Sequence, residues 1–525
     1  MPTASSTSSE VMVGFRWSGT LGTLSSMASC CFSQIEQQQS FLWEKLQQQQ
    51  QHRPARAKTD CQIQSLNARE PTRKFDSEAG TTEFWERDLE EFECAGVAAV
   101  RNNIQPQGLL LPHYNNAPQL IYIVQGRGLL GLVIPGCAET FETPQSERRT
   151  RGEQSREAES HGGDRHQKVR QFQQGDVLAL PAGFTLWLYN NGQENLVTVA
   201  LLDTANPINQ LDLEFRHFFL AGNPHPKGLS GSRYEEEIKS RSEQHLQSGN
   251  FIDGYDPDLI AKVFNVDREL VTRLEGREDQ RGQIIRAERF DVLSPEFEQE
   301  QPYRPGRERP RPNGLEQTIC TMRLRENLGR PSRADVYNPR GGRVSTLNSN
   351  KLPILNWLQL SAERGVLYQA SLYLRLIYGN RNAVMAPYWN TNAHSIIYII
   401  RGNGRFQVVG DAGNSVFDGE VKEGQMIIVP QNFAIVKKAG DQGLEYIAFK
   451  TNDQAMTNPL AGRLSAIRAM PEEVLMNSYQ ISRQDARRLK YNREEATVFA
   501  GRRSTGHSTR AMEYALNAVE AFLKV

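Results

Sequence analysis

The 525-residue chain lacks several features that would assign it to a large functional class. It has no run of about 18 consecutive apolar residues, which argues against a membrane-spanning helix. Its basic residues are interspersed with Glu and Gln and lack interleaved aromatic residues, so we expect no nucleic-acid partner. A glycine-rich phosphate loop, a Cys-x-x-Cys pair and a Gly-x-Ser-x-Gly turn are all absent. The sequence therefore gives no sign of nucleotide-dependent, dithiol or serine-hydrolase chemistry.

Cysteine is scarce, and its few positions are informative. The six cysteines are Cys30, Cys31, Cys61, Cys94, Cys137 and Cys320. An even set of bridges among them would indicate an oxidising secretory route. Residues 1–33 nevertheless contain no continuous apolar segment typical of a signal peptide, because Arg16, glycines and many serines interrupt the stretch. We therefore expect a secreted protein whose signal peptide is not clearly present in this sequence.

Long polar tracts account for the low hydrophobic content of 38%. Residues 34–60 are Gln-rich, residues 138–170 are rich in Ser, Arg and Glu, and residues 223–250 form another polar insert. A Gln/Arg/Pro-rich stretch covers 298–312. Such segments have too few apolar side chains to bury a core of their own. We expect them to be solvated loops around compact domains.

The rest of the chain is an internal repeat, which is a strong signal in a single sequence. The segment Leu120–Gly128 matches Ile396–Gly404, and Gly175–Pro181 matches Gly424–Pro430. In the first copy, β-rich runs at 92–111, 120–133 and 177–202 precede a helical pattern at 257–274. In the second copy, the aligned helical pattern continues to Leu489, with Ser482 and Asp267 at equivalent N-cap positions. The repeat predicts a mainly β protein of two antiparallel barrels, each followed by a small helical extension.

A short stretch between the two copies, Arg311–Cys320 (RPNGLEQTIC), has the features of a processing site. Its dipeptide Asn313-Gly314 follows the polar tract directly, and exposed dipeptides of this kind are where proteases cut. Residues 314–525 contain 27 basic and 18 acidic residues, a net charge of +9, and the remainder carries −9. Opposite charges help two halves to stay associated after a cut. Taken alone, Asn-Gly is equally compatible with a simple turn, and Cys320 with a small buried apolar residue.

The sequence NGLEQTIC closely resembles the junction of legumin-type (11S) seed storage globulins, and the resemblance runs from about Cys61 to about Ser504. It implies a seed storage protein without enzymatic activity, which holds nitrogen and carbon in storage vacuoles reached by the secretory pathway. It implies cleavage by an asparaginyl endopeptidase into an acidic and a basic chain, and precursor trimers that become hexamers after the cut. The implied cleavage site is Asn313-Gly314, and the implied disulfides are Cys61–Cys94 and Cys137–Cys320.

Each copy also resembles the cupin barrel, a double-stranded jelly roll, so the resemblance implies a bicupin. The expected divisions are a Gln-rich leader at 1–60, an N-terminal cupin domain at 61–297, a flexible processing linker at 298–313, a C-terminal cupin domain at 314–504 and an atypical tail at 505–525. Residues 369–380 have no counterpart in the first copy and interrupt the family-like pattern. We predict a bulge or a disordered loop there.

Cupin enzymes hold a metal inside the barrel with three His and one Glu, because imidazole and carboxylate are suitable ligands for such ions. In the first barrel, the aligned positions are occupied by Gln119, Tyr114, Pro112 and Leu186, and a register slip of one leaves only His113. In the second barrel they are occupied by Ser395, Tyr388, Asn390 and Ile435. We expect His113 and His394 to be ordinary rim residues, and we predict no catalytic residue, no cofactor and no metal site.

Two other functions stay open at this point. A metal-dependent bicupin enzyme, such as a germin-like oxidase, is disfavoured by the missing ligands. A sugar-binding or small-ligand-binding bicupin, closer to the vicilins, is disfavoured by the Asn-Gly…Cys junction, which vicilins lack.

Overall fold

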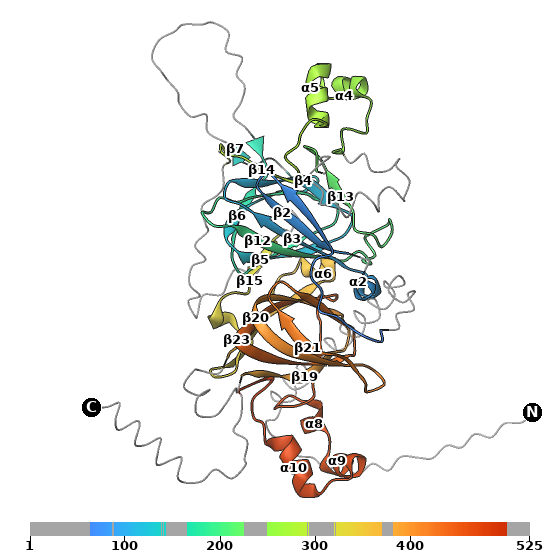
Figure 1. The fold of residues 1–525 in the computed structure, drawn as a ribbon, viewed down its shortest axis with the longest axis vertical. Helices are drawn as coiled ribbons and strands as arrows, with labels where there is room; N and C mark the ends of the chain where they lie inside the picture. The colour runs from blue at the N-terminus through green and yellow to red at the C-terminus, as the bar shows by residue number, and fades with distance from the viewer. Residues whose placement is uncertain are drawn as a thin grey trace, which may run out of the picture. The chain divides into compact units, whose positions relative to one another are not determined.

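The computed structural model describes residues 63–86, 89–137, 139, 141–142, 165–224, 249–290, 292, 320, 322–369 and 382–500. Several sequence predictions concern residues outside this part, and they stay predictions: the leader 1–60, Cys61, the linker 298–313 with Asn313-Gly314, residues 370–380 and the tail 505–525. Within the described part, the two predicted β-barrels with helical extensions are confirmed (Figure 1). None of the helices described is long and apolar enough to cross a bilayer.

The N-terminal barrel consists of two antiparallel sheets. The first has the strand order β1 (Arg73–Ser77), β2 (Gly80–Trp85), β3 (Ala98–Ile104), β12 (Leu196–Leu202), β5 (Gln119–Gln125), β10 (Asp176–Leu180) and β15 (Arg325–Asn327). The second has the order β13 (His217–Phe219), β4 (Gly108–Asn115), β11 (Thr185–Tyr189), β6 (Arg127–Val133) and β9 (Val169–Gln173), and β14 (Ile284–Arg286) also pairs with β4. Strand β7 (Phe141–Glu142) pairs antiparallel with β8 (Arg165–His166) in a separate two-stranded sheet.

The C-terminal barrel repeats this architecture with longer strands. Its path runs through β16 (Val336–Asn338), β17 (Gly342–Leu347), β18 (Ser361–Leu367), β23 (Ala434–Lys450), β19 (Val384–Asn390) and β24 (Thr457–Pro459). Strand β20 (Ser395–Val409) pairs with β23, β21 (Ser415–Lys422) and β22 (Met426–Val429), and β25 (Val498–Phe499) pairs with β19. The repeat extends to single turns, because Gly126 and Gly402 have φ values of 85° and 81°.

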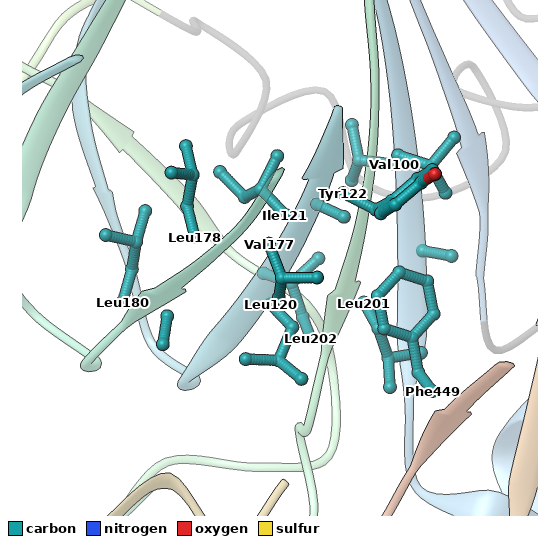
Figure 2. Packing of buried hydrophobic residues seen from close by; sticks show 14 of the residues in the cluster. Val100, Leu120, Ile121, Tyr122, Val177, Leu178, Leu180, Leu201, Leu202 and Phe449 are labelled. Atoms are coloured by element: carbon teal, nitrogen blue, oxygen red, sulfur yellow. The ribbon is translucent and has the colours of Figure 1, made fainter. Parts of the chain in front are cut away.

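Strands where the two barrels meet are apolar on both faces, because both faces are buried. In β20, Ile397 and Ile399 belong to the core of the C-terminal barrel. Their neighbours Ile396 and Tyr398 point the other way, into a cluster shared with the N-terminal barrel. Phe449 of β23 lies in that shared cluster with Leu120, Tyr122, Leu201 and Leu202 (Figure 2). A shared apolar cluster therefore joins the two barrels, beside the separate core of the C-terminal barrel.

The first helix corrects one sequence prediction. Residues 92–95 were expected in a strand, but they lie in α2 (Glu90–Ala95), and the strand begins only at Ala98. Three acidic residues in the first turn favour the helix N-terminus through the helix dipole. Gly96, with φ of 62°, supplies the left-handed residue that ends the helix.

The helical extension of the first barrel is two helices and not one continuous pattern. They are α4 (Pro257–Phe264) and α5 (Arg268–Glu275), and the left-handed Asn265, with φ of 54°, separates them. The predicted Asp267 N-cap is confirmed, since its side chain accepts a hydrogen bond from Leu270 N at 2.7 Å. In the described residues the further helices are α6 (Leu355–Leu358), α8 (Ala466–Ala469), α9 (Glu472–Tyr479), α10 (Arg483–Tyr491) and the 3-10 turn η2 (Pro331–Arg333).

The extension of the second barrel repeats this break. Gln480, with φ of 53°, ends α9, and the predicted Ser482 cap accepts from Asp485 N at 3.1 Å at the start of α10. A left-handed residue followed by a capped helix therefore occurs at the same place in both copies.

Each half of the chain contributes a segment to the other half's barrel. Strand β15, which follows the predicted cleavage site, pairs with β10 of the N-terminal barrel. Its Arg325 donates to Asp176 at 2.9 Å across that pairing. In return, Arg69 exchanges backbone hydrogen bonds of 2.7 and 2.8 Å with Met426 at the start of β22. Strands β10 and β22 are repeat equivalents, so the exchange is reciprocal.

Candidate functional site

Two places could carry function: the interiors of the barrels, where cupin enzymes bind metal, and the junction between the halves. In the N-terminal barrel a cavity of about 20 Å³ is lined by polar and apolar side chains. A space of this size holds one water molecule or one ion. Its polar lining residues are Asn102, His113, Gln119, His217 and Gln283.

The cavity brings together three of the sequence-predicted positions, Gln119, Leu186 and His113. It does not include Tyr114, whose ring stacks on Phe218 at a centroid distance of 4.8 Å, or Pro112. The reason is a β-bulge: β11 pairs Leu186 with His113 but Leu188 with Leu110, so β4 has one extra residue there. A bulge of one residue reverses which side chains face inward. The slipped register is therefore the correct one.

His113 is not the rim residue that the sequence predicted. Its side chain is buried, and its Nδ1–H donates to the Leu111 carbonyl at 2.8 Å. Burial lowers the pKa of His113 to about 4, so the imidazole is neutral at neutral pH. The second histidine of the cavity, His217, has its ring centroid 4.9 Å from that of His113. His394, in contrast, is half-buried, and its Nδ1 accepts from Gln431 N at 3.2 Å.

The C-terminal barrel has a cluster of buried charged and phenolic groups at the corresponding place. Lys450 Nζ donates to Asn390 Oδ1 at 2.9 Å and to Ser395 Oγ at 3.0 Å. Lys437 Nζ donates to the Tyr388 hydroxyl at 2.9 Å. Ile435 pairs with Tyr388 across the strands, so the four positions predicted from sequence lie around these two lysines. Ammonium groups of the chain itself therefore occupy the region where a cupin enzyme binds its metal.

One carboxylate lies beside the two lysines. Glu363 Oε1 accepts from the Tyr446 hydroxyl at 2.9 Å and lies 3.9 Å from Lys437 Nζ. Burial lowers the pKa of Lys437 to about 7, although Glu363 opposes the shift. Burial by itself would raise the pKa of Glu363, but the charges of Lys450 and Lys437 and the Tyr446 bond hold it below its usual value. Burial also lowers the pKa of Lys450, and the charge of Glu363 again opposes the shift.

Sequence reasoning missed His217, Glu363, Lys437 and Lys450. The alternation of the strands contained a signal for them. Alternate residues of a strand face the same side of the sheet. One such set is Ile435, Lys437 and Ala439, and another is Tyr446, Ala448 and Lys450. The apolar members of both sets are buried. Charged residues at inward positions of a strand are uncommon, so they mark a site. Among the residues described, no group of three or more His, Cys, Asp or Glu side chains is placed to hold a metal ion.

The junction between the halves contains a covalent link. Cys137 and Cys320 form a disulfide with a Cα–Cα distance of 5.6 Å across 183 residues of sequence. Cys94 in α2 is also disulfide-bonded, whereas Cys61 lies outside the described residues. Asn313 and Gly314 lie outside them as well, between the two cysteines in sequence.

Comparisons with known proteins agree with this architecture. The cupin family model matches residues 66–225 and 326–487. The 11S globulin seed storage protein 1 of Carya illinoinensis is 47% identical over 488 residues, covering 86% of this chain and 93% of the relative. The 11S globulin of Juglans nigra is 48% identical over 487 residues, covering 86% of this chain and 92% of the relative.

Solved structures give the same result. The crystal structure of pumpkin seed globulin is 44% identical, with a TM-score of 0.70, and covers 84% of this chain and 100% of that one. The shared sequence and the two matching cupin barrels lead to one assignment: this chain belongs to the 11S globulin family of cupin seed storage proteins.

Proposed function

We propose that this chain is a nitrogen and carbon reserve of seed storage vacuoles, made as a precursor and cleaved between Asn313 and Gly314. The observation that carries the proposal is the Cys137–Cys320 disulfide, because it connects residues on either side of that dipeptide. A cut there yields an acidic and a basic chain that stay covalently joined. A second bridge, Cys61–Cys94, would lie within the acidic chain.

The exchanged strands support the same proposal from non-covalent contacts. After the cut, β15 belongs to the basic chain but pairs with β10 of the acidic chain. The segment around Arg69 belongs to the acidic chain but bonds to β22 of the basic chain. Leu66 lies in the core of the C-terminal barrel. Processing therefore leaves the folded protein assembled even when the disulfide is reduced.

Self-association is supported by apolar side chains on the two helical extensions. Leu259 and Phe264 of α4 are 54% and 57% exposed, and their repeat equivalents Val474 and Tyr479 of α9 are 44% and 55% exposed. Exposed apolar residues gathered in this way mark interaction surfaces. Because each chain carries two related surfaces, head-to-tail contacts can close a ring. We propose a trimer of precursors closed by these helices and a hexamer after cleavage.

The processing partner in this proposal is an asparaginyl endopeptidase, met on the secretory route to the storage vacuole. Asn313 supports this choice of protease. The Cys137–Cys320 disulfide supports the secretory route, because disulfides form in oxidising compartments.

The test is gel electrophoresis of the protein from seed tissue or after digestion with an asparaginyl endopeptidase. We expect one band without reductant and two bands with it. Asn313→Gln should give one band under both conditions, and Cys137→Ser should give two bands under both in denaturant. In native buffer, cleaved Cys137→Ser should still elute as one species, because the exchanged strands remain. A wild-type protein that runs as one band with and without reductant would contradict the proposal.

A further inference from the structure

A second and larger cavity, of about 990 Å³, lies between turns of the N-terminal barrel and a strand of the C-terminal barrel. Its N-terminal walls are the turns after β5, β9 and β11, together with the chain that follows β15. The C-terminal barrel contributes Arg364 of β18. Cavities that hold small organic molecules measure about 300–1,000 Å³, so this one has room for a ligand of that size.

Positive charge predominates in the lining of this cavity. Its charged members are three arginines and one glutamate, namely Arg127, Arg330, Arg364 and Glu194. Glu194 is exposed and accepts a hydrogen bond from Gln125 Nε2 at 3.3 Å. Glu445 forms an ion pair with Arg364, and even with this carboxylate counted the cations are in excess. A concave surface with this charge attracts anions.

Arg364 is the buried member of this group. It is 8% exposed, donates to Glu445 and forms a hydrogen bond with the Tyr122 hydroxyl. Burial raises the pKa of Tyr122 to about 12, so the phenol keeps its proton at neutral pH. The Nε of Arg364 has no hydrogen-bond partner in the described part of the chain. The guanidinium therefore has a fixed position and donor capacity beyond its bonds to Glu445 and Tyr122.

We infer that this cavity binds a small multivalent oxyanion, of the phosphate or carboxylate class, through the guanidinium groups of Arg127, Arg330 and Arg364. The planar fork of a guanidinium matches two oxygens of a phosphate or carboxylate group, which makes arginine the preferred residue for such anions. Three arginines in one cavity favour a ligand with more than one negative charge. The inference goes beyond the storage role and does not depend on it.

The walls of the cavity are fixed by bonds that leave the arginines available for recognition. Each wall contributes a glycine to the lining: Gly126, Gly175, Gly192 and Gly329. Gly175 N donates to the Ile123 carbonyl at 2.9 Å, and Gly192 N donates to Asn190 Oδ1 at 2.8 Å. A Cβ at Gly192 would lie 3.4 Å from Arg127 Cγ, so the stem of Arg127 packs over this turn. Fixed walls lower the ordering cost of binding.

The repeat supplies an internal comparison. Tyr398 and Arg101 are the repeat equivalents of Tyr122 and Arg364, and Arg101 Nη1 donates to the Tyr398 hydroxyl at 3.1 Å. The tyrosine–arginine pair is therefore part of the fold in both copies. Asn403 takes the place of Arg127 in the second copy, and its Oδ1 accepts from Gln442 N at 3.3 Å. The second copy lacks that cation, so we expect one anion site per chain.

The test is isothermal titration calorimetry of the full chain, with its disulfides intact, at neutral pH and constant ionic strength. Pyrophosphate and citrate are the multivalent probes, and acetate is the monovalent control. We expect one site per chain for a multivalent probe. Arg127→Gln and Arg330→Gln should each weaken binding by about tenfold or more, because each removes hydrogen bonds to a charged group. The matched control Arg340→Gln removes an exposed arginine outside the lining and should leave the affinity unchanged.

Arg364→Lys tests the buried arginine without removing the charge beside Glu445. Because lysine lacks the planar fork, we expect weaker binding in a chain that circular dichroism shows to be folded. Tighter binding of pyrophosphate assigns the phosphate class, and tighter binding of citrate assigns the carboxylate class. The proposal is overturned if Arg127→Gln/Arg330→Gln binds both probes as tightly as the unsubstituted chain. It is overturned equally if acetate binds as tightly as they do, or if Arg340→Gln weakens binding as much, since either result means general attraction to a charged surface.

Discussion

Glu363→Gln tests whether one carboxylate holds the charged interior of the C-terminal barrel together. Glu363 is the anion beside the buried Lys437 and Lys450, and its Oε1 accepts the Tyr446 hydroxyl at 2.9 Å. Removing one partner of a buried charge pair costs about 3–5 kcal/mol, because the other charge stays buried without compensation. We expect a loss of this size in the free energy of unfolding at pH 6, measured by urea unfolding with fluorescence.

The lowered pKa of Lys437 determines how the effect of Glu363→Gln on the free energy of unfolding changes with pH. The pKa of Lys437 is about 7 in the folded chain and about 10.5 when unfolded. Its buried charge therefore destabilises the fold fully below about pH 7, and the penalty disappears as the pH rises toward 10.5. Glu363 raises that pKa, so Glu363→Gln enlarges the penalty at pH 6. At pH 9 Lys437 is largely neutral, so the loss should be smaller there.

At acidic pH, Glu363 contributes stability to the fold, whereas the buried charge of Lys437 reduces it. The lowered pKa of Glu363 contributes stability that is present above its unfolded value and is lost as the pH falls through the folded value. Glu363→Gln should lack this contribution to acid unfolding. The exposed Glu420→Gln changes the same charge on an outer strand and should stay within about 0.5 kcal/mol of the unsubstituted chain. If Glu363→Gln matched that control at pH 6, the buried pair would have no role in stability.

Three further predictions concern packing and caps, each measured by urea unfolding. Phe449→Ala should cost about 3–5 kcal/mol and shift both halves in one transition, because the ring belongs to the shared core; two separate transitions would contradict this. Gly365→Ala should cost about 1–3 kcal/mol, since a Cβ there would lie 2.2 Å from the Tyr446 ring, whereas Gly254→Ala has open space and should change little. Asp267→Ala should cost about 1 kcal/mol through loss of the α5 cap, and an unchanged midpoint would argue against that cap.

The parts of the fold that the sequence predicted were those governed by local pattern. Repeated strand and glycine motifs predicted two equivalent barrels, and Gly126 and Gly402 indeed share one turn conformation. Asp267 and Ser482 were identified as caps because capping depends on a few adjacent residues. The run at 92–95 was assigned wrongly, because apolar composition does not separate a short buried helix from a strand.

The candidate site could not be predicted from the sequence, because it depends on which face of each strand points inward and on contacts between distant residues. The bulge opposite Leu186 turns His113 inward, and a single extra residue of this kind leaves no signature in the strand pattern. His217 meets His113 across a separation of 104 residues only because β13 pairs with β4. Likewise, Lys437 and Lys450 become neighbours of Glu363 when β23 pairs with β18.

By itself the sequence determined the repeat, the opposite charges of the halves and the family of the junction, since each is a property of residues close together in the chain. Tertiary structure decided what lies inside each barrel: a histidine pair around a small cavity in the first, and a glutamate with two lysines in the second. It also decided that each half forms backbone hydrogen bonds with the other, through strand β15 in one direction and the Arg69 bridge in the other. Which side chains face a shared interior is set by strand pairing and register, and these are fixed only when the whole chain folds.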